Sequence, residues 1–331
     1  MRTAVIGAGA WGSALADLLV RNGHDTVLWA REGDVAASVN EAHENRRFLA
    51  GHRLAPAIRA TTDHSDAVRG ADLVVYAAPS DYLRHIAAAG AASVGPGAIL
   101  VVATKGIERG SLALMTTVVA DEVPRRAVVG FSGPSFAAEV VARQPTAVVA
   151  ASDDEEAALA VQTAFSGGSF RVYTADDVVG VELAGALKNV MAVAAGVVEG
   201  VGLGLNSRAA LITRGLHEMR RLGVALGAQP ATFAGLAGVG DLVLTCTGAL
   251  SRNHALGVAL GQGCSLAEAM AGKETVAEGV PTTASAMELA TKLDVDMPIV
   301  QMVYRILFEG HEAARAVPEL MARELRPEQD L

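Results

Sequence analysis

The sequence predicts an α/β N-terminal domain with a doubly wound, mostly parallel sheet, followed by an all-α C-terminal domain. In the first half of the chain, short apolar runs rich in β-branched residues alternate with helical segments, which is typical of a sheet covered on both faces. After Asp176 these runs stop, and the chain continues as Ala-, Leu- and Gly-rich segments with helical spacing. We therefore expect two domains, residues 1–178 and 179–331, which the length of 331 residues also favours.

The expected strands of the first domain follow one another with helical segments between them. They are TAVIG (3–7), TVLWA (26–30), AIRAT (57–61), DLVVYAAP (72–79), AILVVAT (98–104), AVVGF (127–131), TAVVAAS (146–152) and FRVYT (170–174). A helical pattern from Gly12 to Arg21 follows the first strand. In the second domain we expect helices to break at QPA (229–231), TGALS (247–251) and MP (297–298), and RPEQDL to form a polar tail.

Composition and charge exclude several classes of protein. With 51% hydrophobic and 19% charged residues, the chain can build buried cores and has no signature of disorder. The formal charge of −9 argues against nucleic-acid binding, so local cations must hold any anionic ligand. No secretory signal is expected in MRTAVIGAGAWG, and no membrane span, because a charge or a Pro interrupts the apolar runs. Two cysteines, Cys246 and Cys264, match no metal pattern and favour a reducing, cytoplasmic location.

The segment GAGAWG contains Gly7, Gly9 and Gly12 in the G-x-G-x-x-G pattern. It follows a predicted strand and opens a helix, the context in which this pattern indicates a Rossmann-type dinucleotide-binding domain. Gly7 permits a tight turn, Gly9 lets the backbone approach a pyrophosphate, and Gly12 allows the helix to pack on the strand. The alternative is an ordinary glycine-rich turn.

The end of the second strand bears on the choice of cofactor. NAD-specific domains place an Asp or Glu about 20 residues beyond the glycines, where it binds the ribose 2′-hydroxyl. This chain has Arg31 there, with Glu32 one step later, and an Arg can accommodate a 2′-phosphate. We therefore expect NADPH as the preferred cofactor, with NADH also used. The alternative is a solvated Arg31 beside a functional Glu32.

The lysines are candidates for acid–base chemistry, because a nicotinamide enzyme needs a group that exchanges a proton with the substrate oxygen. Lysine can do this and arginine cannot, and the chain has only four lysines. Lys188 lies beside Asn189 in an apolar helical segment, ELAGALKN (182–189), and Lys105 follows the end of a strand. The alternatives are a Lys188 whose stem covers apolar surface and a purely structural Lys105.

Several segments resemble those of one enzyme family, the bacterial NAD(P)-dependent glycerol-3-phosphate dehydrogenases. The stretch GALKNVMAVAAGVVEGVGLGLN (185–206) is similar to the family's signature segment. Five other segments occur in the family's order at plausible spacing: ATKGIE, FSGPSFAAEV (131–140), GVGDLVLTC (238–246), SRNHALG (251–257) and VAEGV (276–280). The resemblance covers nearly the whole chain.

This resemblance implies a reaction and a pair of catalytic residues. The enzyme would reduce dihydroxyacetone phosphate to sn-glycerol 3-phosphate, which the family normally makes for glycerophospholipid synthesis. Lys188 would donate a proton to the C2 oxygen while hydride is delivered to C2, and Asp241 would hold Lys188 and orient the substrate hydroxyls. The alternative for Asp241 is a helix N-cap.

The resemblance and the glycine motif together imply the binding residues. The expected substrate-binding positions are Lys105, Gly133, Ser135, Lys188, Asp241, Ser251, Arg252 and Asn253. The expected cofactor-binding positions are Gly7, Gly9, Ala10, Trp11, Gly12, Arg31, Lys105, Ala137, Arg252, Val276 and Glu278. SRN (251–253) offers a hydroxyl, a guanidinium and an amide to a phosphate at a helix start, although these are also capping and surface residues. The family commonly has a hydroxyl residue where this chain has Ala10, which removes one possible phosphate hydrogen bond.

Two other functions share part of this pattern. Ketopantoate reductases and 3-hydroxyacid dehydrogenases also combine a Rossmann domain, a helical domain and a helix-borne Lys near an Asn, but they recognise a carboxylate; the SRN cluster favours phosphate. A non-enzymatic NADPH-binding sensor would need the glycines but neither Lys188 nor Asp241. A homodimer through the helical domain is expected on general grounds, because most oligomers are symmetric dimers.

Overall fold

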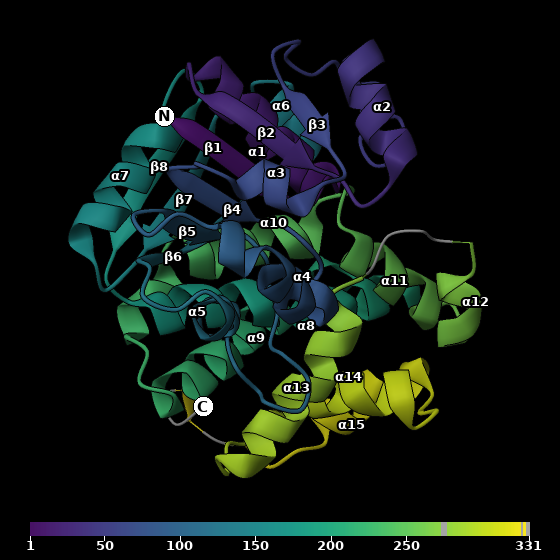
Figure 1. The fold of residues 1–331 in the computed structure, drawn as a ribbon. Coiled ribbons are helices and arrows are strands. Elements are labelled where there is room, and N and C mark those ends of the chain that lie inside the picture. The colour runs from purple at the N-terminus through teal and green to yellow at the C-terminus, as the bar shows by residue number, and fades with distance from the viewer. Residues whose placement is uncertain (273–276, 326, 329–331) are drawn as a thin grey trace. The chain divides into compact units, whose positions relative to one another are not determined.

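The computed structural model describes residues 1–272, 277–325 and 327–328 (Figure 1). Among them, eight strands form one sheet in the order β3-β2-β1-β4-β5-β6-β7-β8, and all neighbours are parallel except β6 and β7. The strands are β1 (Arg2–Ile6), β2 (Asp25–Trp29), β3 (Arg59–Thr61), β4 (Leu73–Tyr76), β5 (Ile99–Val102), β6 (Val128–Ser132), β7 (Thr146–Ala151) and β8 (Phe170–Ala175). Each strand overlaps one of the expected runs, so the mostly parallel sheet is confirmed.

The strand order reverses at β1. Val5 of β1 pairs with Leu28 of β2 on one side and with Val75 of β4 on the other. The chain therefore builds outward from β1 in one direction and then in the other, which is the doubly wound arrangement. In such sheets, ligands bind beyond the carboxyl ends of the strands at the reversal, where β1 and β4 end here.

Both faces of the sheet are buried, which explains why its strands are apolar throughout. Val5, Leu28 and Val75 point to one face, and their neighbours Ile6 and Val27 point to the other. The first face is covered by α1 (Ala10–Arg21), α2 (Gly33–Ala42), α6 (Ala137–Val141) and α7 (Glu155–Phe165). The second is covered by α3 (His64–Val68), α4 (Leu83–Gly90) and α5 (Met115–Glu122), with short turns η1 (Ser80–Tyr82) and η2 (Ala91–Ser93). Figure 1 shows the strands side by side between these helices.

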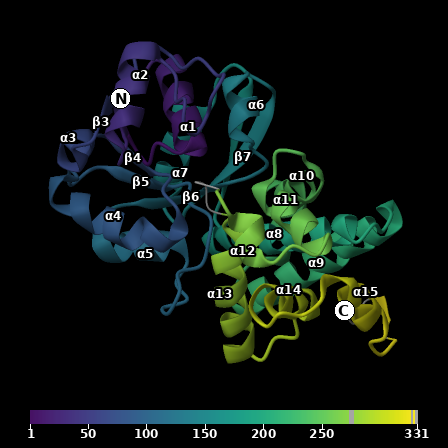
Figure 2. The ribbon, with the colours of Figure 1, turned by 90° about the vertical axis from the view of Figure 1, so that its right-hand side faces the viewer.

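The second half of the described chain is helical (Figure 2). Its elements are α8 (Val178–Gly200), α9 (Leu205–Ala225), η3 (Pro230–Ala234), η4 (Leu236–Gly240), α10 (Asp241–Thr247), α11 (Arg252–Gly261), α12 (Leu266–Met270), α13 (Gly279–Lys292), α14 (Pro298–Phe308) and α15 (Ala313–Met321). The expected breaks are confirmed, because helices end or begin at residues 229–231, 247–251 and 297–298. The polar tail at 326–331 lies largely outside the described residues.

Facing glycines bring the backbones of α8 and α11 into contact. A Cβ on Gly196 would lie 2.1 Å from the His254 carbonyl oxygen, and one on Gly257 would lie 2.1 Å from the Val193 carbonyl oxygen. Gly200 and Gly261 face each other in the same way one turn further along. Pairs of small residues four apart let two helices approach this closely. The spacing therefore sets the distance between the residues that α8 and α11 present to each other.

α8 is long and apolar enough to cross a membrane by length and composition alone, with a mean hydropathy of 1.5 over its most apolar window. However, 89% of that window is buried inside the protein. Packing against neighbouring helices accounts for its apolar composition, since a helix that is hydrophobic all round is a core helix in a large protein.

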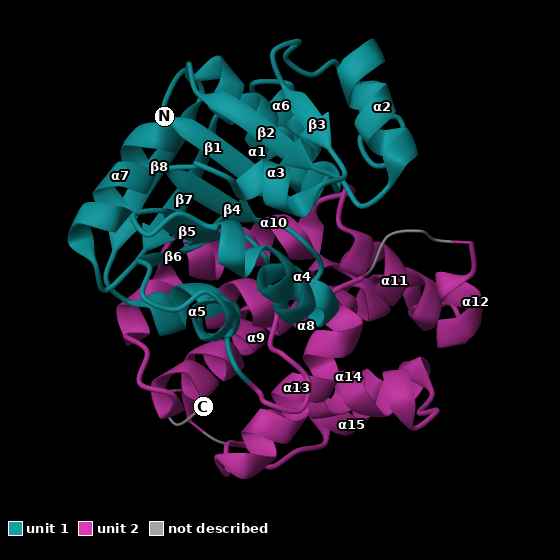
Figure 3. Cartoon of the chain, in the orientation of Figure 1, with its two compact units in different colours: residues 1–105, 113–182 teal, residues 106–112, 183–331 magenta. Residues whose placement is uncertain are grey.

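The chain divides into two compact units (Figure 3). Unit 1 comprises Met1–Lys105 and Ala113–Glu182, and unit 2 comprises Gly106–Leu112 and Leu183–Leu331. The boundary expected between residues 178 and 179 therefore falls in the first turn of α8. Glu182 ties that turn to unit 1, because its carboxylate accepts hydrogen bonds from the Thr116 N–H and hydroxyl at 2.9 and 2.5 Å. Nothing in the sequence pattern indicated that Gly106–Leu112 groups with the helical unit.

Candidate active site

The turn between β1 and α1 requires glycine at two of its three motif positions. Gly7 has a φ of +117°, and a Cβ there would lie 2.9 Å from the Ala77 carbonyl group. A Cβ on Gly12 would lie 1.8 Å from the Gly7 carbonyl oxygen. Any side chain at either position would push α1 away from the sheet. These two glycines therefore serve the fold.

Gly9 is different, because nothing in the protein requires it. Its φ of −67° and ψ of 179° suit any residue, and a Cβ there would have no atom within 4 Å. Gly9 is the N-cap of α1, and no described side chain caps that end of the helix. Ala10 begins the helix, and the buried Nε1 of Trp11 finds no acceptor among the described residues. The open space and the unused donors fit a phosphate-bearing ligand that approaches the backbone at Gly9.

Arg31 lies just beyond the end of β2, as expected, but it is ion-paired. Its Nε and Nη2 donate to Glu32 Oε1 at 3.0 and 2.7 Å, and the Arg31 side chain is 72% exposed. An exposed pair of this kind contributes little to stability. The guanidinium can therefore exchange Glu32 for another anion at small cost.

Lys105, Gly133 and Ser135 lie together in unit 1. Because β5 and β6 are parallel, the residues that follow them meet at one edge of the sheet. The Gly133 carbonyl oxygen accepts hydrogen bonds from Lys105 Nζ at 3.2 Å and from the Ser135 hydroxyl at 3.0 Å. Gly133 has a φ of +146°, and a Cβ there would lie 2.8 Å from Val148 Cα. Ala137 follows as the first residue of α6.

In unit 2, Lys188 of α8 and Asp241 of α10 form a buried ion pair. Lys188 Nζ donates to Asp241 Oδ1 at 2.5 Å, and the two residues are 8% and 0% exposed. Asp241 does not cap α10; it is the first helical residue, and Gly240 occupies the cap position. A buried pair is a weak source of stability, because apolar residues of similar volume usually serve as well. Its presence therefore points to chemistry.

Thr245, which no sequence motif indicated as a site residue, and Cys246 lie near this pair. The Thr245 hydroxyl donates to the Asp241 carbonyl oxygen at 2.6 Å and lies 3.3 Å from its Oδ1. The four-residue spacing on one helix was the only available signal for that contact. Burial raises the pKa of the Cys246 thiol to about 12, with the charge of Lys188 opposing it. Cys246 is therefore not a nucleophile near neutral pH.

An amide network joins α8, α11 and α13 next to Lys188. Asn253 Nδ2 donates to Asn189 Oδ1 at 2.9 Å, and Asn253 Oδ1 accepts from the Gly279 N–H at 2.9 Å. Both asparagines are buried. Gly279 also permits close approach, since a Cβ there would lie 2.8 Å from the Asn189 carbonyl oxygen. This network fixes Asn189, the neighbour of Lys188, relative to the start of α11.

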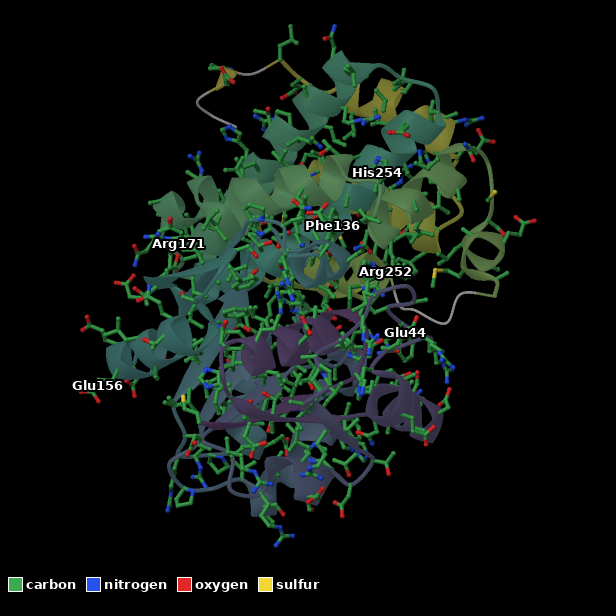
Figure 4. All side chains as sticks on the ribbon, turned by 90° about the horizontal axis from the view of Figure 1, so that it is seen from above. Glu44, Phe136, Glu156, Arg171, Arg252 and His254 are labelled. Carbon is green, nitrogen blue, oxygen red and sulfur yellow. The ribbon has the colours of Figure 1, made fainter. Side chains whose placement is uncertain are left out.

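The SRN segment begins α11. Ser251 is the N-cap, and its hydroxyl accepts from the His254 N–H at 3.2 Å, so the capping interpretation of Ser251 holds in this structure. Arg252, labelled in Figure 4, is the first residue of α11. The residue as a whole is exposed, yet partial desolvation lowers the pKa of its guanidinium group, and the carboxylate of Glu278 opposes that shift. Val276, expected to contact the cofactor, lies outside the described residues.

The doubly wound sheet with its G-x-G-x-x-G turn, followed by a helical unit, is typical of the class of NAD(P)-dependent oxidoreductases. Comparison with known proteins narrows this class. Models of the NAD-dependent glycerol-3-phosphate dehydrogenase N-terminus and C-terminus match residues 2–158 and 177–318. The chain belongs to the NAD-dependent glycerol-3-phosphate dehydrogenase family.

Individual relatives support this family assignment. A glycerol-3-phosphate dehydrogenase [NAD(P)+] of Geobacter sulfurreducens is 53% identical over 330 residues, covering 99% of this chain and 98% of the relative. The crystal structure of glycerol-3-phosphate dehydrogenase from Coxiella burnetii superposes with a TM-score of 0.94 at 38% identity, covering 97% of this chain and 99% of that one. A ketopantoate reductase structure from Ralstonia eutropha has a TM-score of 0.62 at 15% identity over 93% of this chain and 97% of its own, and shares the fold alone.

Proposed function

We propose that this chain catalyses the reversible NAD(P)H-dependent reduction of dihydroxyacetone phosphate to sn-glycerol 3-phosphate, with Lys188 as the acid–base group. The observation that carries this proposal is the buried Lys188–Asp241 pair at 2.5 Å. It places a titratable cation, held by a carboxylate, on the core helix of the helical unit. We assign dinucleotide binding to the N-terminal domain (residues 1–178), and substrate binding and catalysis to the helical domain (residues 179–331).

The cofactor-binding role of the first domain is supported by the open backbone at Gly9 and the uncapped start of α1. When bound, the nicotinamide supplies the hydride that reduces C2. The N–H groups at the start of α1 would hold the pyrophosphate, and the other proposed contacts come from side chains and backbone around the sheet edge and from the helical domain. The proposed cofactor-binding residues are Gly7, Gly9, Ala10, Trp11, Gly12, Arg31, Lys105, Ala137, Arg252, Val276 and Glu278.

Lys188 performs the proton transfer in this proposal. Its ammonium group donates a proton to the C2 oxygen as that oxygen gains negative charge, and solvent then restores the proton. Asp241 holds the ammonium group in place and keeps it charged, because an adjacent carboxylate favours the charged form. The Thr245 hydroxyl lies beside this carboxylate, 3.3 Å from Asp241 Oδ1. In the oxidative direction, neutral Lys188 takes the proton back.

The substrate phosphate needs local cations and N–H donors, because the chain as a whole carries a formal charge of −9. Arg252 supplies a guanidinium that can bind phosphate with two parallel hydrogen bonds, and Asn253 lies beside it at the start of α11. Lys105 adds a second cation, and Gly133 and Ser135 add polar groups around it. The full proposed set is Lys105, Gly133, Ser135, Lys188, Asp241, Ser251, Arg252 and Asn253.

We also propose the cofactor preference, the use of the product, the location and the oligomeric state. Arg31 at the end of β2 favours NADPH over NADH, with both used. The product would supply glycerophospholipid synthesis in the cytoplasm, where the free thiols Cys246 and Cys264 would stay reduced. We propose a homodimer, because closed symmetric dimers are the commonest oligomers.

A spectrophotometric assay tests the proposal. Oxidation of NADPH and NADH is followed with dihydroxyacetone phosphate and, separately, with ketopantoate. We expect turnover with the phosphate substrate and a lower KM for NADPH than for NADH. Turnover with the carboxylate alone would assign the chain to the ketopantoate reductases. Tight NADPH binding without turnover of either substrate would favour a sensor.

A further inference from the structure

Asn45, a residue that no sequence motif indicated, forms hydrogen bonds with the glycine-rich turn and the start of α1. It lies between α2 and β3 and is fully buried. Its Nδ2 donates to the Ala8 carbonyl oxygen at 2.7 Å and to the Ser13 hydroxyl oxygen at 2.8 Å. Its Oδ1 accepts from the Phe48 N–H at 3.0 Å. The Asn45 side-chain nitrogen therefore binds the turn, and its side-chain oxygen binds the segment that carries Asn45.

The segment that carries Asn45 is also held by contacts that do not involve Ala8 or Ser13. The Ala55 N–H donates to Asp17 Oδ1 at 2.8 Å, and Asp17 is also ion-paired with Arg21 at 2.8 Å. The Leu54 N–H donates to the His43 carbonyl oxygen at 2.8 Å, which closes the segment on itself. Asn45 therefore lies in a segment whose position is fixed by other hydrogen bonds, and its contact with Ala8 can orient the turn.

The planar peptide bond between Ala8 and Gly9 links the direction of the Ala8 carbonyl group to the direction of the Gly9 N–H. The Ala8–Gly9 bond is trans, so the Ala8 C=O and the Gly9 N–H point in opposite directions within one plane. Because Asn45 binds the Ala8 oxygen on the buried side, the Gly9 N–H faces away from the core. No described residue accepts a hydrogen bond from it, and the space beside Gly9 is open. The N–H is therefore presented to whatever binds there.

We propose that Asn45 is a positioning residue for the dinucleotide: by holding the Ala8 carbonyl oxygen, it aims the Gly9 N–H at the cofactor pyrophosphate. This inference rests on the cofactor-binding role proposed above for the turn. Without the Asn45 donor, the Ala8–Gly9 peptide plane can rotate, and the N–H no longer faces the phosphate. Asparagine suits the position because it donates to the turn and accepts from Phe48 while remaining neutral in a buried site.

Two variants and a matched control separate this role from a structural one. Asn45→Asp still accepts the Phe48 N–H but cannot donate to Ala8, and Asn45→Ala removes both functions. The control is Asn40→Ala, because Asn40, although exposed, also donates to one backbone group and accepts from another, the Ala60 carbonyl oxygen and N–H at 2.9 and 2.8 Å, away from the turn. For each protein, the Kd for NADPH is measured by calorimetry and the Tm by thermal unfolding.

We expect both Asn45 variants to raise the NADPH Kd and KM at least about tenfold, the size of one lost hydrogen bond to a charged group. The KM for dihydroxyacetone phosphate should change less than about twofold, and kcat at saturating NADPH should be retained. Asn40→Ala should lower the Tm but leave the Kd within about twofold. An Asn45→Asp protein that folds and binds NADPH with the wild-type Kd would overturn the inference, as would equal rises in Kd in Asn40→Ala.

A measurement on the wild-type protein covers the case in which the Asn45 variants do not fold. With glycine labelled selectively by ¹⁵N, we expect the Gly9 amide proton to shift downfield when NADPH is added, because it then donates to a phosphate oxygen. A Gly9 signal that does not respond to bound NADPH would refute the inference and leave the proposed function standing. Wild-type protein that binds no NADPH would instead refute the proposed function.

Discussion

Lys188 Nζ lies 2.5 Å from Asp241 Oδ1, although 53 residues separate them in the chain; the Asp241 side chain is fully buried and the Lys188 side chain is 10% exposed. Removing one partner of such a pair leaves the other charge buried and uncompensated, which costs about 3–5 kcal/mol. A test of Lys188 must therefore separate loss of chemistry from loss of folding.

Replacing Lys188 by arginine makes this separation. Lys188→Arg keeps the positive charge beside Asp241 but cannot give up a proton, so we expect kcat to fall at least about 100-fold with the NADPH Kd unchanged. Lys188→Ala should lose as much activity and also lower the Tm. Steady-state kinetics, calorimetry and thermal unfolding check these outcomes. Near-normal turnover in a folded Lys188→Arg protein would show that another group donates the proton.

Gly9→Ala should impair cofactor binding without harming the fold. The backbone at Gly9 suits alanine and the added methyl group meets no protein atom, so stability should be unchanged or rise by up to about 1 kcal/mol. The methyl group would occupy the space that the pyrophosphate needs, and the NADPH Kd should rise at least about tenfold. Gly12→Ala is the contrasting variant, since its methyl group would overlap the Gly7 carbonyl oxygen and destabilise the domain. Equal Kd values for wild type and Gly9→Ala would contradict this assignment.

Arg31→Ala tests the proposed preference for NADPH. If the guanidinium binds the 2′-phosphate, the variant should raise the KM for NADPH about tenfold or more and leave the KM for NADH within about twofold. Glu32→Gln is the matched change on the other side of the ion pair, and it should weaken NADH binding only if Glu32 binds the ribose hydroxyls. An unchanged ratio of the two KM values in Arg31→Ala would exclude Arg31 from cofactor selection.

Glu218 should make stability depend on pH in the neutral range. Its buried carboxyl group accepts from the Ile299 and Val300 N–H groups at 2.8 and 3.2 Å, at the start of α14. Burial nevertheless raises its pKa from 4.5 to about 7. The folded state therefore binds more protons than the unfolded state between about pH 4.5 and 7, so this group's contribution is complete below pH 4.5 and is lost as the pH rises through 7.

Glu218→Gln isolates that contribution, because glutamine resembles the protonated carboxyl group. The free energy of unfolding is measured by urea denaturation at several pH values. Between pH 5 and 8 it should decrease more in wild type than in Glu218→Gln, and the difference between the two decreases should be on the order of 2–3 kcal/mol. Glu182, whose pKa burial also raises to about 7, should add a second decrease of the same sign. If the free energy of unfolding depends on pH in the same way in wild type and in Glu218→Gln, the buried Glu218 carboxyl group is not the cause of that dependence.

Gly257→Ala tests the close contact between α8 and α11. The added methyl group would collide with the Val193 carbonyl oxygen, and the helices would have to separate, at a cost of at least about 2 kcal/mol. Separation also moves Asn253 away from Asn189, so the KM for dihydroxyacetone phosphate should rise. Gly97→Ala is the control, because a Cβ there meets no atom within 4 Å and stability should change little. Urea denaturation and steady-state kinetics give both readouts.

The sequence by itself determined the features that depend on local geometry. Alternation of apolar strands with helices predicted the sheet, since residues in a strand buried on both faces must be apolar whatever they pack against. The glycine spacing predicted the turn at Gly7–Gly12, because backbone sterics act over a few residues. Lys188 stood out because a cation in an apolar helix is costly unless it is paired. The resemblance to a family supplied the expectation of Asp241 as its partner.

Only the tertiary structure decided which distant residues meet. The pairing of Lys188 with Asp241, the contact of Asn45 with Ala8 and the grouping of Gly106–Leu112 with the helical unit each join parts of the chain that no periodicity relates. Their distances depend on how closely whole elements pack, as the facing glycines of α8 and α11 illustrate. A local pattern specifies the conformation and burial of each residue, whereas the identity of its neighbours follows from packing all the elements at once.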